Sequence, residues 1–409
     1  MFTSSAGRVI TCLAPGWRRR AVAVAVAVLP GLIVCAAAHA AQVRASAAQN
    51  LYVSPRGSVR SMCTRVAPCK TITRAVELAA TGSTISVAHG TYREDVALTK
   101  SLTIVGHGDP VVNAAGKADG FLLSGTGAAG ATVKGFVVEN ATFEGILAKR
   151  TSDVTIADNV VKDNDRGLTA KHPVGECAPA GGVPGTCGQA IHLMSVTDSR
   201  VLANLVESNA GGGIRLTDEL GPTALNLVAG NRILNNPFGC GMVLSSVNPS
   251  ALSAGGTPDP SGGGVYGNIV TNNITDGNGV KGSGAGILLA GVATYDNVLD
   301  GNTANGNGWA GITLLHSFPP GQDNGNVITA NKLADDGVSL PPPGSPLASF
   351  MPSGTVGIVV SSAVPVAATT IAGNTISDVN YGIWTANTTS TVSQAANTFQ
   401  SVAVPLTQN

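Results

Sequence analysis

Basic side chains recur in a set of similar short segments, each built on a Gly-Ile-x-Leu pattern or a close variant of it. In an extended strand whose Ile and Leu point inward, the residue between them points outward, which places His192 and Arg215 on an outer face. The next outward residue is Lys149 in one segment and Lys171 in another. If the segments stack as consecutive coils, these four side chains share one face within about 15 Å.

Such a basic face could bind the carboxylates of a uronic acid polymer, because Arg and Lys pair with carboxylates and could also remove the proton next to the carboxylate. We therefore interpret Lys171, His192 and Arg215 as candidate catalytic residues. The candidate substrate-binding residues are their neighbours on this face or along the chain: Lys149, His172, Asp218 and Glu219. An adjacent acid could supply protons or help to bind calcium.

The competing interpretation is that these are solvated side chains on an exposed sheet face. It is the more common situation, because any outward column collects some charge. Inserted loops favour the functional interpretation, since binding groups often lie on long loops of a rigid scaffold. Insertions fall at 173–188, 246–264, 317–325 and 336–355. The first contains Cys177 and Cys187 and lies between Lys171 and His192, so it is the best candidate for the wall of a cleft.

The segments belong to an internal repeat that begins near Ala131 and places two asparagines in each unit. The closest spacing of successive units is 22 to 23 residues, which accommodates three short strands and three turns. Strands that bury only one face must stack coil upon coil to form a continuous core. Asn suits the bends, because it tolerates the left-handed region and can form a ladder of side-chain amides. The first column is Asn159, Asn204, Asn231, Asn273, Asn302, Asn331, Asn374 and Asn397, and the second is Asn164, Asn209, Asn236, Asn278 and Asn307, with Asp336 at the next second-column position.

The repeat therefore predicts an all-β right-handed parallel β-helix, a solenoid. A leucine-rich repeat is the nearest alternative, but its regularly spaced leucines are replaced here by Val and Ile with paired Asn. The segment 70–80 has Ile72, Ala75, Val76 and Ala79 on one helical face, and we expect it to form an amphipathic helix that caps the N-terminal end.

The N-terminal residues have the composition of a signal peptide. Arg18 to Arg20 precede an apolar run from Ala21 to Ala38, which ends at the small-residue site Ala38-His39-Ala40. We expect 1–40 to be the signal peptide, 41–130 to hold the cap and first coils, and 131–409 to continue them as one domain of β-helix repeats. The product would be secreted, extracellular or periplasmic, with no membrane span after removal of the leader.

Charge and cysteine content limit the kinds of partner that we expect for this chain and the state of its cysteines. Only 12% of residues are charged, and without the leader the chain carries a net charge of −4, so nothing favours nucleic acid as a partner. In an exported chain the close pairs Cys63 with Cys69 and Cys177 with Cys187 predict disulfides, and no histidines stand at zinc-finger spacing beside them. Cys240, among apolar residues, predicts a buried free thiol.

Three stretches near the N-terminus carry a resemblance to a known family: LYVSPRG, CTRVAPCKTITRAVELA and STISVAHGTYREDVALTKSLTIVGHG. They resemble the first coil of secreted proteins in the pectin-lyase-like right-handed β-helix superfamily, and the repeats from Val137 to Val404 are similar to those of that superfamily. The resemblance implies the fold. Members include pectate and pectin lyases, polygalacturonases, alginate epimerases, phage tailspikes, adhesins and periplasmic metal-processing proteins, so it does not imply one activity.

We expect a monomer that contacts a polysaccharide or cell-surface glycan, and, if it is an enzyme, a lyase or epimerase that acts on uronic acid polymers. The alternative is a non-catalytic surface, adhesion or structural protein, in which the β-helix is a stiff spacer. A metal-handling function has little support, because the six histidines are dispersed and no methionine cluster exists.

Overall fold

The computed structural model describes residues 47–167, 188–282, 284–316, 323–340, 352–362, 366–386 and 392–408. Lys171, His172, Cys177 and Cys187 lie outside these described residues, as does the predicted signal peptide. The chain from Ala45 to Asn409 forms one compact unit. Among the described residues, no helix is both long enough and apolar enough to cross a membrane.

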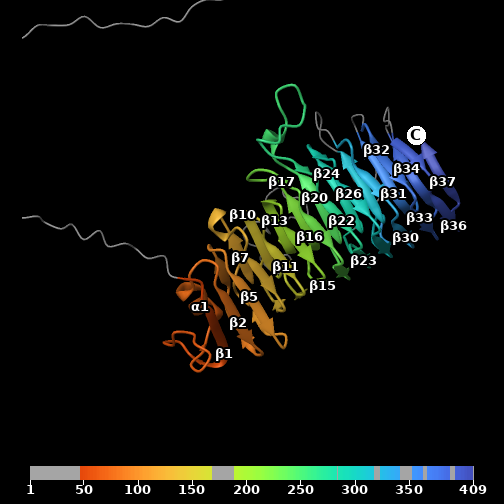
Figure 1. Cartoon of the computed structure of the whole chain (residues 1–409). Helices are drawn as coiled ribbons and strands as arrows, with labels where there is room; N and C mark the ends of the chain where they lie inside the picture. The colour runs from red at the N-terminus through yellow and green to blue at the C-terminus, as the bar shows by residue number, and fades with distance from the viewer. Residues whose placement is uncertain are drawn as a thin grey trace, which may run out of the picture. The chain divides into compact units, whose positions relative to one another are not determined.

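Short strands dominate the structure and form three parallel sheets, in which each coil contributes a strand to each sheet in turn (Figure 1). Sheet A is 12-stranded, in the order β1 (Asn50–Ser58), β2 (Thr84–Ala88), β5 (Thr103–His107), β8 (Thr132–Lys134), β11 (Thr155–Ala157), β14 (Arg200–Leu202), β18 (Leu227–Ala229), β22 (Ile269–Thr271), β26 (Val298–Asp300), β29 (Val327–Thr329), β32 (Thr369–Ala372) and β35 (Val392–Ala395).

Sheet B is 11-stranded, in the order β3 (Thr91–Tyr92), β6 (Val111–Asn113), β9 (Val137–Glu139), β12 (Val160–Lys162), β15 (Leu205–Glu207), β19 (Arg232–Leu234), β23 (Ile274–Asp276), β27 (Thr303–Asn305), β30 (Lys332–Ala334), β33 (Thr375–Ser377) and β36 (Thr398–Gln400).

Sheet C is 14-stranded and carries the Gly-Ile-x-Leu segments. Its main path is β4 (Val96–Leu98), β7 (Phe121–Ser124), β10 (Ile146–Ser152), β13 (Gln189–Thr197), β16 (Gly212–Thr217), β20 (Met242–Ser246), β24 (Ile287–Gly291), β28 (Ile312–His316), β31 (Val356–Ser362), β34 (Tyr381–Ala386) and β37 (Val404–Gln408). The far end of β13 continues through β17 (Thr223–Ala224), β21 (Val265–Tyr266) and β25 (Thr294–Tyr295). Short 3-10 helices are η1 (Thr126–Ala128) and η3 (Pro249–Ala251).

Register aligns the inward side chains of successive coils. Ile146 pairs with Ile191, which pairs with Ile214, and all three are fully buried in one continuous apolar core. The pattern of alternating burial therefore arises from the period-two geometry of each strand. All strand pairs are parallel, which confirms the predicted parallel β-helix.

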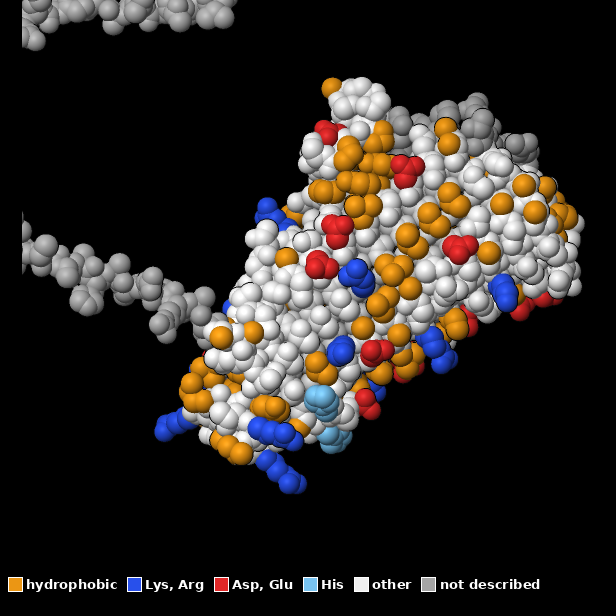
Figure 2. Space-filling view, in the orientation of Figure 1, with side chains coloured by type: hydrophobic (Ala, Val, Ile, Leu, Met, Phe, Trp, Pro, Cys, Tyr) orange, Lys and Arg blue, Asp and Glu red, His pale blue; other side chains and the backbone are white. Residues whose placement is uncertain are grey.

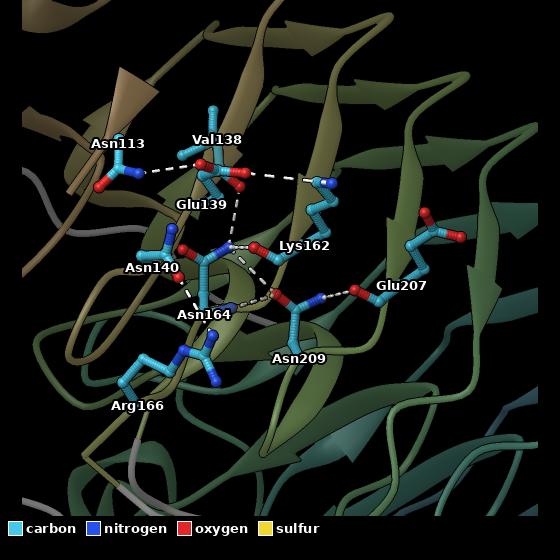
Figure 3. A network of polar contacts seen from close by, with 9 residues as sticks. All are labelled: Asn113, Val138, Glu139, Asn140, Lys162, Asn164, Arg166, Glu207 and Asn209. Atoms are coloured by element: carbon cyan, nitrogen blue, oxygen red, sulfur yellow. Dashed lines mark hydrogen bonds and ion pairs between the residues drawn. The ribbon is translucent and has the colours of Figure 1, made fainter. Parts of the chain in front are cut away.

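The asparagine columns form ladders at the turns, as predicted. Within a ladder, the amide nitrogen of one asparagine donates to the amide oxygen of the next coil, as Asn231 Nδ2 does to Asn273 Oδ1 at 2.9 Å. Asn231 Nδ2 also donates to a backbone carbonyl, that of Val201. Figure 3 shows the same arrangement in the second ladder, where Asn164 donates to Asn209 beside the outer-face pair of Glu139 and Lys162. Buried amides at these bends thus find partners on both sides.

A third ladder was missed in the sequence. It consists of Asn226, Asn268, Asn297 and Asn326, each of which precedes a first-column asparagine by five residues. Asp336 ends the second ladder, as its position predicts, and its Oδ1 accepts hydrogen bonds from the backbone and side-chain nitrogens of Asn307 at 2.9 and 2.8 Å.

The predicted N-terminal helix is present as α1 (Ile72–Leu78), which packs against β1, β2 and β4. Its first amides donate to Glu94, and Lys100 Nζ donates to the carbonyls of Val76 and Ala79 at its other end, which satisfies groups that a short helix leaves unpaired. Its function as a cap stays a prediction. Cys63 and Cys69 form a disulfide, whereas Cys240 is a free thiol and only partly buried.

Candidate functional site

A pocket of about 290 Å³ opens on the outer face of sheet C, over β13 and β16. Its lining brings together an acid, an imidazole and a guanidinium from three successive coils: Glu144, Gly188, Gln189, His192, Met194, Arg215 and Glu219. Two of the candidate catalytic residues, His192 and Arg215, therefore share this pocket, and Glu219 of the candidate binding residues lies at it.

Strand pairing explains which of the predicted residues meet. His192 pairs with Leu147 on one side and with Arg215 on the other, so β10 and β13 are direct neighbours. The sequence analysis placed a further coil, which carries Lys171, between these two strands. That prediction is wrong, because β10 pairs directly with β13. Lys149 pairs with Met194 and is half-buried, two residues further along the strand than His192.

His192 points outward yet is almost completely covered. Its side chain is 5% exposed, with Nδ1 lying 3.1 Å from Oε1 of Glu144, whose side chain is 6% exposed. On the other side of the ring, Nε2 lies 2.7 Å from Oγ1 of Thr217, which is fully buried. The imidazole is thus held in one orientation between a carboxylate and a hydroxyl, where its tautomer is set by these two neighbours.

A second carboxyl group contacts Glu144. Asp119 Oδ1 accepts a hydrogen bond from the backbone nitrogen of Glu144 at 3.3 Å, and the charge of the Glu144 carboxylate acts on the carboxyl group of Asp119. Burial raises the pKa of Asp119 to about 7, and the charge of Glu144 contributes in the same direction. Burial also raises the pKa of Asp165 well above its usual value, again with a contribution from Glu144. The neutral forms of both aspartates are therefore favoured around Glu144.

The sequence analysis missed Asp119 and Glu144, although a signal was present. Each stands two residues before a buried residue of sheet C, namely Phe121 and Ile146, which pair with each other. Gln189 occupies the same position before Ile191. Asp119, Glu144 and Gln189 thus form a column at the start of the strands of sheet C, beside the column of outward residues that contains His192. An acid directly before the Gly of a Gly-Ile or Gly-Phe pair would have identified both carboxyl groups.

Arg215 supplies the positive charge of the pocket. It is half-buried, and its Nε finds no hydrogen-bond partner among the described residues. A guanidinium presents several donors in a fixed plane and binds carboxylates through two parallel hydrogen bonds. The pocket therefore combines a carboxylate-binding group with an imidazole that can exchange a proton.

Asp218, a candidate substrate-binding residue because of its position along the chain, does not line this pocket. It is fully buried, and its carboxylate accepts hydrogen bonds from Ser246 Oγ and from the backbone nitrogens of Val247, Asn248 and Gly264 at 2.7 to 3.1 Å. These contacts hold both ends of the 246–264 insertion, and they occupy the oxygens that a ligand would need. The structure thus places Asp218 in a structural position.

No group of three His, Cys, Asp or Glu side chains within the described ranges is arranged to hold a metal ion.

Comparison with known families gives two matches. A family described as "Protein of unknown function (DUF1565)" matches residues 56–273, and one described as "Periplasmic copper-binding protein (NosD)" matches residues 261–406. Among curated proteins, none matches the chain.

Several solved structures are similar in fold. The Dettilon tailspike protein superimposes with a TM-score of 0.52 and 15% identity, covering 86% of this chain and 68% of its own. The A-module of Azotobacter vinelandii mannuronan C-5 epimerase AlgE4 gives 0.45 and 17%, with 80% and 89% covered. The alginate lyase from Paenibacillus sp. str. FPU-7 gives 0.46 and 12%, with 88% and 99% covered. With the family matches and the three parallel sheets, the tailspike similarity shows a pectin-lyase-like right-handed β-helix.

Proposed function

Since this chain belongs to the DUF1565 family, whose description assigns no function, we propose a function from its own site: it is an exported β-helix protein that binds an acidic polysaccharide at the Arg215 pocket and acts on its uronate units. The observation that carries the proposal is the placement of His192, held between Glu144 and Thr217 next to Arg215.

The chemistry follows from these three groups. Arg215 binds the carboxylate of a uronate and withdraws electron density, so the proton on the adjacent carbon becomes more acidic. To act as general base, His192 gives up the hydrogen bond between Nε2 and Oγ1 of Thr217 and accepts that proton, and Glu144 stabilises the imidazolium that forms. In a lyase, the bond between the next carbon and the glycosidic oxygen then breaks. The oxygen takes a proton from the imidazolium, so the products are an unsaturated uronate and a new sugar hydroxyl. Return of a proton from the opposite face inverts the carbon, as in an epimerase.

Charge in the pocket is compatible with an anionic ligand. The raised pKa values of Asp119 and Asp165 reduce the negative charge around Glu144. Glu219 is exposed at the pocket, where solvent screens it, while Lys149 lies close enough to Asp119 to act on its pKa. The neutral carboxyl groups also support the proton transfers that an elimination or epimerisation needs.

The leader-like composition of residues 1–40 supports export, and the second matching family is described as periplasmic. We therefore place the working protein outside the cytoplasm, as a monomer with a glycan rather than nucleic acid as its partner.

One observation favours a non-catalytic surface or structural protein instead. Both His192 and Glu144 are nearly inaccessible and hydrogen-bonded, which is the usual condition of buried polar groups that stabilise a fold. In that case His192 fixes the outer face of sheet C, and Arg215 is a solvated surface charge.

Product formation separates the two functions. Purified protein is incubated with polygalacturonate, alginate, hyaluronan and neutral glycans, with and without calcium. Unsaturated uronates are followed by ultraviolet absorbance, and epimerisation by exchange of the carbon-bound proton with D₂O. We expect activity on one acidic polymer, reduced at least roughly 100-fold in Arg215→Ala and His192→Gln.

The matched control is Arg200→Ala, because Arg200 is an exposed arginine on sheet A whose ion-pair partner among the described residues is an exposed aspartate, Asp153. Its activity should equal that of the wild type, and thermal unfolding checks that each variant is folded. A wild type that releases no product and exchanges no proton on any polymer would falsify the catalytic proposal and favour the structural function.

A further inference from the structure

A second groove, of about 440 Å³, lies on a different face, over the first strands of sheet A. It is lined by Tyr52 and Ser54 of β1, Ser86 of β2, His107 of β5, and Arg65 and Pro68 of the disulfide loop. Its size is within the range of small-molecule sites, roughly 300–1,000 Å³. The proposed function uses none of these residues.

The floor of the groove is formed by side chains that point outward because burial alternates along β1. Leu51 and Val53 are buried in the core, so Tyr52 and Ser54 between and after them point outward. Tyr52 pairs with Ser86, which places a phenol and a hydroxyl side by side on neighbouring strands. His107 extends this polar surface to a third strand, where it pairs with Ala88.

The wall of the groove is a loop that is fixed at several points. Arg65 lies within the ring closed by the Cys63–Cys69 disulfide. The carbonyl of Cys63 accepts a hydrogen bond from the amide of Tyr52 at 2.7 Å, and the carbonyl of Pro68 accepts one from Ser58 at 3.1 Å. Opposite the loop, Nδ1 of His89 lies 2.6 Å from the carbonyl of Gly108, which ties down the turn after His107. A ligand would therefore meet a largely pre-formed site, which lowers the entropy cost of binding.

The groove is basic. Figure 2 shows Lys, Arg and His side chains gathered over the strands at the N-terminal end of sheet A. Among the described residues, Arg65 has no ion-pair partner, whereas the nearby acids Glu77, Glu94 and Asp95 contact Arg74, the start of α1 and Lys117, respectively. Asp109, two residues after His107, is exposed to solvent. The unpaired guanidinium is thus the strongest available partner for an anion.

We propose that this groove is a second carbohydrate-binding site, which takes an acidic sugar unit through its carboxylate or sulfate group. Arg65 pairs with the anionic group, and the hydroxyls of Tyr52, Ser54 and Ser86 together with His107 bind sugar hydroxyls. Tyrosine is suited to sugars, because it offers an apolar ring with a polar tip. The site lies on sheet A and the first pocket on sheet C, so binding here does not require the chemistry proposed for Arg215.

Calorimetric titration in an Arg215→Ala background tests this site apart from the first one. The probes are trigalacturonate, sulfated maltotriose and neutral maltotriose. We expect at least one acidic trisaccharide to bind more tightly than maltotriose. Adding Arg65→Ala should weaken its binding by about tenfold or more, because a charged hydrogen bond is lost, while Arg60→Ala changes it by less than about twofold. Arg60 is the matched control, since it is exposed, precedes the same disulfide ring and does not line the groove.

Hydrogen exchange of the backbone locates the ligand. Bound trisaccharide should slow exchange in peptides that cover 50–56 and 84–90. The proposal is overturned if neither acidic trisaccharide binds, if maltotriose binds equally well, or if Arg65→Ala and Arg60→Ala behave alike. These outcomes do not depend on whether Arg215 binds a polymer, because every protein in the series lacks it.

Discussion

Burial of Asp119 next to Glu144 governs how this carboxyl group near His192 behaves with pH. Burial favours the neutral form of Asp119, and the charge of Glu144 adds to it, so the pKa of Asp119 rises to about 7. In an unfolded chain an aspartate has a pKa of about 3.9. The folded protein therefore holds a proton that the unfolded chain releases, and stability linked to this group is complete below pH 4 and is lost as the pH rises through 7.

Replacement of Asp119 by Asn should remove that dependence. The amide is neutral at every pH, and its oxygen can still accept the hydrogen bond from the backbone nitrogen of Glu144. At pH 8 we expect Asp119→Asn to be more stable than the wild type by about 2 kcal/mol, a value reduced from the full shift because Asp119 is partly solvated. Urea unfolding at pH 4 to 8 measures this. Parallel pH profiles of the two proteins would show that the pKa of Asp119 is not raised in the folded protein.

At the element scale, the turns restrict the sequence closely. The ladder asparagines lie against the glycines of the Gly-Ile segments. A Cβ added to Gly286 would lie 2.9 Å from Nδ2 of Asn307, and one added to Gly311 would lie 2.6 Å from Oδ2 of Asp336. Both approaches are closer than side chains tolerate, so these positions need glycine. Oδ2 of Asp336 thus occupies the place that Nδ2 takes in the other coils.

Because Oδ2 of Asp336 takes the place of an asparagine Nδ2, we expect the substitution Asp336→Asn to be stabilising. Oδ2 of Asp336 is buried without a hydrogen-bond partner among the described residues, and burial raises its pKa to about 8. Asn307 Nδ2 donates to the carbonyl of Thr275, and an Asn at 336 would donate in the same way to that of Ala304. The wild type loses stability between about pH 4 and 8, as its folded-state proton is released.

We therefore expect the free energy of unfolding of Asp336→Asn to exceed that of the wild type by about 3 kcal/mol at pH 9, and by much less at pH 4. Chemical denaturation at the two pH values measures both differences. Asp335→Asn is the control, since it changes the same charge at the preceding turn residue, outside the ladder. An equal gain from both variants would mean that net charge, not completion of the ladder, is responsible.

Across the whole molecule, stability depends on each coil having neighbours on both sides, because a coil cannot bury its own core face. Ile376 and Ile383 of the next-to-last coil are fully buried, whereas their partners Phe399 and Leu406 in the last coil are half-buried and 49% exposed, respectively. The sheet orders end at β35, β36 and β37. The last coil should therefore open locally at a lower free energy than the middle of the solenoid.

Hydrogen exchange can measure this gradient. Amides in β35 to β37 should exchange at least roughly tenfold faster than those in β32 to β34, which in turn should match β14 to β16. Uniform protection along the chain would contradict this expectation and would indicate that something covers the last coil in solution, such as a second copy of the chain.

The fold could be predicted from the sequence, because the repeat of Asn, Gly and inward-facing apolar residues is local and one repeat corresponds to one coil. The repeat also predicted Asp336 as a ladder residue and placed His192 and Arg215 on one face. The prediction of a further coil between β10 and β13 was wrong, because Gly167 and Leu168 resemble the Gly-Ile pair of the repeat.

Which polar groups are buried, and what they contact, depends on the tertiary structure. Nothing in the sequence distinguishes Asp218 from Asp119, yet the carboxylate of Asp218 accepts from four donors, whereas Asp119 accepts from the backbone of Glu144, whose charge helps to raise its pKa. These environments arise where separate coils and an inserted loop meet, and the repeat encodes neither. The fold depends on the repeated residues, whereas the site depends on how non-repeated residues of different coils are placed together.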